Sequence, residues 1–153
     1  MHSECTVYLG VKKSIGITQK DICAVVDAAF HRMLTKKKIY LVSIHVVGEQ
    51  RMKTLNSMFR GVERSTDVLS FAVQEGMKIP EQEGAVDWGD IFLCPWYVRR
   101  QAKRFGVSYK EEFFRMLIHG VLHLEGYDHE KKTDAKKMFA VQERLLTTAL
   151  KKI

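Results

Sequence analysis

Alternating hydrophobic and polar positions divide the chain into short segments that suit strands and longer segments that suit helices. Strands show runs of β-branched and aromatic residues, whereas helices repeat apolar residues three and four positions apart. On this basis we expect strands at 5–11, 39–47, 66–73 and 89–94, and helices at 18–35, 49–59, 96–105, from 108 to about 126, and 133–150.

Local signals mark the ends of two of these helices and one loop. Ser108 and Glu111 form an S-x-x-E capping box at the start of the fourth helix. Gly106 and Gly126 each follow a last periodic residue, where a glycine with positive φ commonly ends a helix. Residues 74–87 have no periodicity, and we expect an acidic loop or a loose hairpin there.

The predicted order of elements is βαβαββααα, which is typical of the α+β class. The length of 153 residues fits one domain with a substantial hydrophobic core. We therefore expect residues 1–153 to form a single domain in which helices cover a mixed sheet of about four strands.

Cysteine usage and hydropathy indicate the compartment. Cys5, Cys23 and Cys94 are odd in number and far apart, and no CxxC pair occurs, which favours a reducing environment. The N-terminus lacks a basic segment followed by an apolar run, and no apolar stretch reaches the roughly 18 residues of a membrane span. The sequence thus predicts a cytoplasmic protein.

The balance of charge points to a class of partner. Lysine and arginine outnumber the acidic residues, for a net charge of +7 and a pI of about 9.4. A basic surface favours encounter with polyanions, either nucleic acid or an anionic membrane surface.

Three of the six histidines lie within HGVLHLEGYDH, residues 119–129. His119 and His123 are four apart, so a helix would place both on one face, where their nitrogens could reach a single ion. Gly126 can turn the chain back, and His129 could then meet the same ion from a loop. Three imidazoles leave one position of a tetrahedral zinc open, as in catalytic sites. The alternative is a helix with scattered histidines, one of which caps its end.

The spacing of these histidines matches the HExxHxxGxxH signature of the metzincin metalloproteases, with one change. The protease places a glutamate beside the first histidine as general base, and this chain has Gly120 there. Neither Glu125 nor Asp128 has the required offset. We therefore expect a metzincin-like metal-binding helix without the base for peptide hydrolysis.

The same segment resembles the H-G-x-L-H-L-x-G-Y-D-H signature of the YbeY family of bacterial rRNA maturation factors. LNSMFRGVERSTDVLSFA (55–72) and WGDIFLC (88–94) are similar to two further blocks of that family. The three blocks occur in the family's order and span residues 55–129. One departure is Ala72, where the family usually has proline after S-F.

The resemblance implies a metal-dependent endoribonuclease that acts on single-stranded RNA. Its implied roles are maturation of the 16S rRNA 3′ end and ribosome quality control. It further implies that His119, His123 and His129 hold one Zn²⁺ per chain and that Arg60 is an essential arginine of the active-site cleft. The implied partners are the small ribosomal subunit and, as candidates, a ribosomal protein or an assembly GTPase.

Arg60, Asp67 and Asp128 each admit a functional and a structural interpretation. The Arg60 guanidinium can grip a phosphate bidentately, or it can be a surface arginine at a helix end. Asp67 could orient Arg60 or a histidine, or it could be a turn residue. Asp128 could accept a histidine N–H, or it could cap the turn that follows the helix.

Basic and aromatic residues interleave along 91–110, without any acidic residue. Aromatic faces and cations together can hold single-stranded nucleic acid. The alternative is that the aromatic residues belong to the core and the cations to a solvated helix face. The residues concerned are Trp96, Tyr97, Arg99, Arg100, Lys103, Arg104, Phe105, Tyr109 and Lys110.

Three functions remain open from the residues alone. The first is a metal-dependent RNA phosphodiesterase, in which either water or the substrate's 2′-OH is the nucleophile. The second is a metalloprotease, against which Gly120 weighs. The third is a non-catalytic ribosome assembly factor with a structural metal, which accounts equally well for the missing general base.

Overall fold

The computed structural model describes residues 3–30, 39–73, 85–127 and 130–153, and its elements follow the predicted order βαβαββααα. The strands are β1 (Ser3–Leu9), β2 (Ile39–Val46), β3 (Val68–Ala72) and β4 (Ala85–Leu93). The helices are α1 (Gln19–Phe30), α2 (Glu49–Arg60), α3 (Pro95–Phe105), α4 (Tyr109–Leu124) and α5 (Lys132–Lys152). Within these ranges no helix combines the length and the apolarity that crossing a membrane requires.

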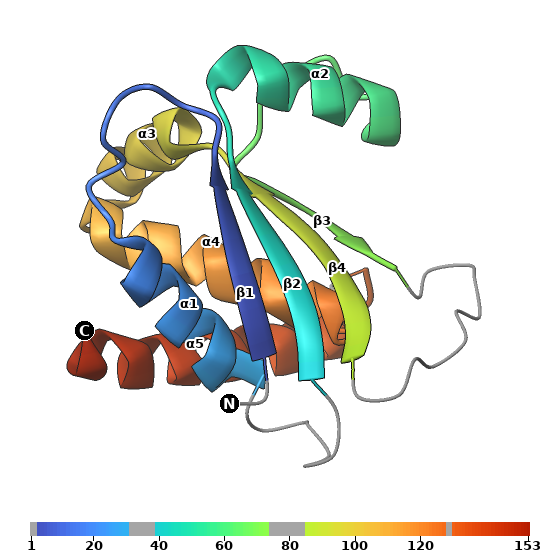
Figure 1. The fold of residues 1–153 in the computed structure, drawn as a ribbon, viewed down its shortest axis with the longest axis vertical. Helices are drawn as coiled ribbons and strands as arrows, with labels where there is room; N and C mark the ends of the chain where they lie inside the picture. Colours follow the sequence, from blue (N-terminus) through green and yellow to red (C-terminus); the bar gives the residue numbers. More distant parts are fainter. Residues whose placement is uncertain (1–2, 31–38, 74–84, 128–129) are drawn as a thin grey trace.

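The four strands form one mixed sheet in the order β1-β2-β4-β3. β1, β2 and β4 are parallel, and β3 pairs antiparallel with β4 at the edge. Helices α1, α4 and α5 lie on one side of the sheet, and α2 lies near one end of it (Figure 1). The predicted α+β domain with a four-stranded mixed sheet is confirmed.

The core lies between the sheet and α4, the most buried helix. Phe113, Phe114 and Leu117 of α4 are fully buried and pack with Ile44 and Ile91 of the sheet in one cluster. Full burial of such a side chain contributes about 1.5–3 kcal/mol. α4 also contacts α1, α3 and α5, so its position is restrained from several sides.

The helix-end signals form as predicted. The Ser108 hydroxyl accepts a hydrogen bond from the Glu111 backbone N–H at 3.1 Å. Gly106 and Gly126 have positive φ angles of 68° and 96°. After Gly126, the Tyr127 N–H donates to the Leu122 carbonyl at 3.0 Å, which closes the last turn of α4.

The largest boundary error is at β4, which begins at Ala85 and not at residue 89. Smaller differences occur at β1, which is Ser3–Leu9 and not 5–11, and at β3, which is Val68–Ala72 and not 66–73. The first residues of β4 pair with the start of β2, before a register shift that lies beside Gly89. Gly89 has a φ of 138°, and a Cβ there would overlap the Phe71 carbonyl oxygen. This irregularity interrupts the alternation of side chains that identifies a strand in sequence. The rest of the predicted loop, 74–84, lies outside the described residues.

Gly120 lies on the side of α4 that packs against the sheet. A Cβ at this position would lie 2.9 Å from Cγ2 of Ile91 on β4. Both residues are buried. The position beside His119 therefore faces the packed interior, and its small size allows α4 to dock on β4.

We expect Gly120→Ala to lower the free energy of unfolding. Overpacking against Ile91 costs about 1–3 kcal/mol. That exceeds the gain of about 0.8–1 kcal/mol when alanine replaces glycine inside a helix. Chemical denaturation measures the change. A more stable Gly120→Ala protein would contradict the close-packing interpretation.

Candidate functional site

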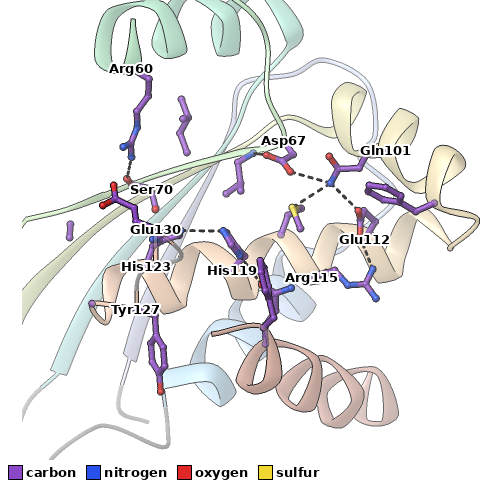
Figure 2. Close-up of a pocket in the computed structure, with 18 of the residues that line it drawn as sticks. Arg60, Asp67, Ser70, Gln101, Glu112, Arg115, His119, His123, Tyr127 and Glu130 are labelled. Carbon is purple, nitrogen blue, oxygen red and sulfur yellow. Dashed lines mark hydrogen bonds and ion pairs between the residues drawn. The ribbon is translucent and has the colours of Figure 1, made fainter. Parts of the chain in front are cut away.

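A cleft of about 1060 Å³ opens between the edge strand β3 and the helices α3, α4 and α5 (Figure 2). Its floor comes from α4, and Arg60 at the end of α2 lies at its rim. This volume is slightly above the range of about 300–1,000 Å³ for small-molecule pockets. The polar residues that line it are Arg60, Asp67, Ser70, Gln101, Glu112, Arg115, His119, His123, Tyr127, Glu130 and Gln142.

His119 and His123 project from the same face of α4 into this cleft, as their spacing predicts. The two Nε2 atoms are 3.1 Å apart, and the rings meet edge to face with centroids 4.7 Å apart. Two nitrogens that each lie about 2.0–2.1 Å from one tetrahedral zinc are about 3.3 Å apart. The separation and the chemistry of this imidazole pair therefore fit a shared zinc ion.

His129 and Asp128, which the sequence also proposes for the site, lie outside the described residues. Across 3–30, 39–73, 85–127 and 130–153, no group of three or more His, Cys, Asp or Glu side chains is arranged to hold a metal. The structure thus describes two of the three predicted metal ligands, His119 and His123.

Side chains from α5 fix the ring of His119. Its Nδ1 atom is 2.7 Å from the Oε1 atom of Gln142, which is only 4% exposed. Phe139 stacks on the same ring with centroids 6.2 Å apart. The other ring nitrogen, Nε2, is directed toward His123 (Figure 2).

Arg60 is exposed at the last position of α2, which Gly61 ends with a φ of 69°. Its Nη2 group donates to the Ser70 carbonyl on β3 at 3.4 Å, and its guanidinium lies 6.0 Å from the centre of the Phe71 ring. Figure 2 shows this side chain across the cleft from α4. The structure therefore places Arg60 and the histidine pair around the same cleft.

Asp67 serves the turn that leads into β3. Its Oδ1 accepts from the Val68 N–H at 2.7 Å, and its Oδ2 accepts from Gln101 at 3.1 Å. Within the part of the chain that the structure describes, Asp67 forms no hydrogen bond or ion pair with Arg60 or a histidine. They agree with the turn interpretation and add a link to α3.

Two further residues from the family-like blocks lie away from the histidines. Asn56 donates to the Arg64 carbonyl at 2.7 Å and so holds the loop after α2. Asp90 pairs with His45 at 2.8 Å on the sheet face opposite the core. His45 stacks there between Tyr8 and Phe92, so the histidine on β2 is not part of the cleft.

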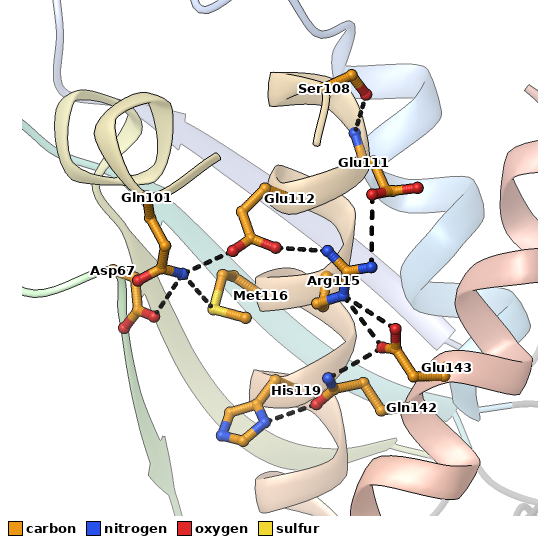
Figure 3. Close-up of polar contacts among 10 residues, drawn as sticks. All are labelled: Asp67, Gln101, Ser108, Glu111, Glu112, Arg115, Met116, His119, Gln142 and Glu143. Carbon is orange, nitrogen blue, oxygen red and sulfur yellow. Dashed lines mark hydrogen bonds and ion pairs between the residues drawn. The ribbon is translucent and has the colours of Figure 1, made fainter. Parts of the chain in front are cut away.

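A continuous polar network runs along the cleft between α3, α4 and α5 (Figure 3). Gln101 donates to Glu112 at 2.9 Å, and Arg115 donates to Glu112 at 2.6 Å. The Arg115 Nε group also donates to both oxygens of Glu143, at 3.1 and 3.2 Å. Gln142 then connects Glu143 to His119.

Arg115 on α4 and Glu125 at its C-terminal end have displaced pKa values. Burial alone would lower the pKa of Arg115, but its hydrogen bonds to Glu143 and Glu112 raise it above the usual range. Burial raises the pKa of Glu125, the residue that caps α4, to about 8. Glu125 lines a smaller cavity beside Leu122 and does not line the main cleft.

In the basic and aromatic segment 91–110, some residues suit a nucleic-acid-binding surface and others belong to the packed structure. Tyr109 is half-buried, donates to the Ile15 carbonyl at 2.7 Å and lies under Arg99. Trp96 and Phe105 are 41% and 62% exposed. Phe105 lines the cleft, so one exposed aromatic ring of α3 lies where the cleft opens.

Sequence reasoning missed the residues that support the histidines. Glu112 and Arg115 are three apart on α4, which is a local signal for an ion pair. Gln142 and Glu143 lie on α5, and nothing in their spacing relates them to His119. Only the packing of α5 on α4 brings them together.

Comparisons with known proteins agree with the resemblance in the sequence. A sequence model of the family described as Endoribonuclease YbeY matches residues 10–150. A protein of that name from Lactobacillus helveticus is 37% identical over 126 residues, covering 74% of this chain and 72% of its own. Another from Persephonella marina is 39% identical over 105 residues, covering 68% and 67%.

A solved structure shares the fold. The solution structure of TM1509 from Thermotoga maritima superimposes with a TM-score of 0.66 at 29% sequence identity, covering 97% of this chain and 91% of that one. The family match spans nearly the whole chain, and several relatives exceed 30% identity. This chain belongs to the YbeY family.

Proposed function

We propose that this chain is a zinc-dependent endoribonuclease that cuts single-stranded RNA. We further propose that it acts in the cytoplasm, in maturation of the 16S rRNA 3′ end and in ribosome quality control. Its relatives carry the name Endoribonuclease YbeY. The main support for the proposal is that the Nε2 atoms of His119 and His123 lie 3.1 Å apart in a cleft that Arg60 also lines.

In this proposal the residues of the chain have separate tasks. His119, His123 and His129 would hold the zinc, which when bound polarises a phosphate oxygen and lowers the pKa of a water. Arg60 would bind the substrate phosphate through its planar fork of N–H donors. Its bond to Ser70 orients the guanidinium and engages one of its five N–H groups.

Phe105 and the polar network shown in Figure 3 would position the RNA strand. The exposed Phe105 ring at the cleft offers a face on which a base can stack. The cations of α3 add positive potential beside it. Arg115 is engaged by Glu112 and Glu143, so we assign it to the support of the cleft and not to the phosphate.

Two alternative functions are less well supported. A metalloprotease needs a carboxylate beside the first histidine, and Gly120 instead packs against Ile91. A non-catalytic assembly factor with a structural metal does not require an arginine at an open cleft beside the histidine pair.

We also propose residues 1–153 as one metal-dependent hydrolase domain. Its partners would be the small ribosomal subunit and either a ribosomal protein or an assembly GTPase.

We expect about one zinc per chain in protein purified without an affinity tag. Replacing His119, His123 and His129 together with alanine should remove it, because imidazole nitrogens supply the ligands. Elemental analysis measures the metal. His45→Ala is the matched control, since His45 pairs with Asp90 outside the cleft. Equal metal in the wild type and the triple variant would place the metal elsewhere.

We expect Arg60→Ala to abolish or severely weaken cleavage of single-stranded RNA while fold and metal content stay intact. Arg60→Lys should also be poor, because a point charge lacks the planar fork. Cleavage assays with highly purified protein test this, with His119→Ala in parallel. Arg51→Ala is the matched control, since Arg51 is exposed on the same helix and does not line the cleft. Full activity in both Arg60 variants would remove Arg60 from the site.

We expect no measurable cleavage of unstructured peptides under conditions where single-stranded RNA is cut. Loss of a general base costs peptide hydrolysis about 10²–10⁴-fold. RNA already carries a charged phosphate and its own 2′-OH. RNA binding should weaken steeply as salt rises, because phosphate contacts release counterions. Metal-dependent peptide cleavage that is lost in His123→Ala, with RNA left intact, would instead support the protease.

A further inference from the structure

We propose that Gln142 is a positioning residue that sets the tautomer of His119 and so presents its Nε2 lone pair to a metal. This inference rests on the proposed metal site and adds to it a residue of α5. Gln142 is buried, and its Oε1 atom lies 2.7 Å from Nδ1 of His119 (Figure 3).

The orientation of the Gln142 amide follows from its second contact. Its Nε2 group lies 3.2 Å from Oε2 of Glu143. A carboxylate accepts hydrogen bonds and donates none, so the NH₂ end of the amide must face Glu143. The carbonyl end, which only accepts, is thereby turned toward His119.

The carboxylate that orients Gln142 is itself held in place. Arg115 Nε donates to both oxygens of Glu143, and another N–H of Arg115 donates to Glu112. Charged bonds of this kind are about twice as strong as neutral ones. We call this series of hydrogen bonds, from Arg115 through Glu143 to Gln142, the relay; each of its side chains is held by at least one hydrogen bond.

The relay determines which nitrogen of His119 carries the proton. A neutral imidazole has one N–H and one lone pair. Since the Gln142 carbonyl only accepts, Nδ1 must be the N–H donor, which leaves the lone pair on Nε2. Nε2 is the atom that approaches His123 at 3.1 Å. His119 is thus held in the form that binds metal through Nε2 before any metal arrives.

Two variants separate the hydrogen bond from the packing. Gln142→Met keeps the length of the side chain but removes the amide acceptor. The double variant Gln142→Glu with Glu143→Gln keeps an acceptor beside His119 and a donor–acceptor pair between positions 142 and 143. Asn56→Leu is the matched control, because Asn56 is also buried but donates to the Arg64 carbonyl and does not line the cleft.

The first measurement is ¹⁵N NMR of the His119 ring in metal-free protein, at a pH where imidazoles are neutral. We expect the Nδ1–H form in the wild type and in Asn56→Leu, and a shift toward the Nε2–H form in Gln142→Met. An unchanged tautomer in Gln142→Met would overturn the proposal.

The second measurement is zinc affinity by competition with a chelator. Gln142→Met should bind zinc about 10–100-fold more weakly, which is typical for loss of a group that orients a ligand. The double variant Gln142→Glu with Glu143→Gln should recover most of this affinity, and Asn56→Leu should not change it. Equal losses in Gln142→Met and in the double variant would reduce Gln142 to a packing role. If the wild type binds no zinc, the proposed function fails, while the NMR measurement on metal-free protein still decides the role of Gln142.

Discussion

The close contact between α4 and β4 at Gly120 determines the geometry of the whole site. Because a Cβ would lie 2.9 Å from Ile91, only a glycine lets the helix approach the sheet this closely. The face of α4 that carries Phe113, Leu117 and Val121 is buried. Another face carries His119 and His123 into the cleft. The position where a protease has its glutamate thus lies on the packed side of the helix.

A second constraint is the ionic network that crosses the helices around the cleft. Glu112 is 1% exposed, and its charge is compensated by Arg115 at 2.6 Å. Removing the partner of a buried charge costs about 3–5 kcal/mol, much more than an exposed pair contributes. The same arginine also reaches the half-exposed Glu143 on α5. The packing of α5 on α4 brings Gln142 to His119, which links the arrangement of the helices to the tautomer that we propose for His119.

Local residue patterns were sufficient for most elements and failed where a contact is long-range. Caps such as Ser108 and the glycine at 126 act within one turn, and both appear as expected. The start of β4 was misplaced because its bulge at Gly89 depends on the approach of β3. Asp67 looked equally suited to a turn and to the site, and its hydrogen bonds to Val68 and Gln101 agree with the turn.

The sequence by itself determined the class of fold, the order of the elements and the pairing of His119 with His123, because helical and strand periodicities act over a few residues. It also indicated the family, through three ordered blocks of residues. Only the tertiary structure decided that Arg60 shares a cleft with the histidines and that Gln142 faces His119. Those relations join α2 to β3 and α5 to α4, and their physical origin is the burial of α4 against the sheet and its neighbouring helices.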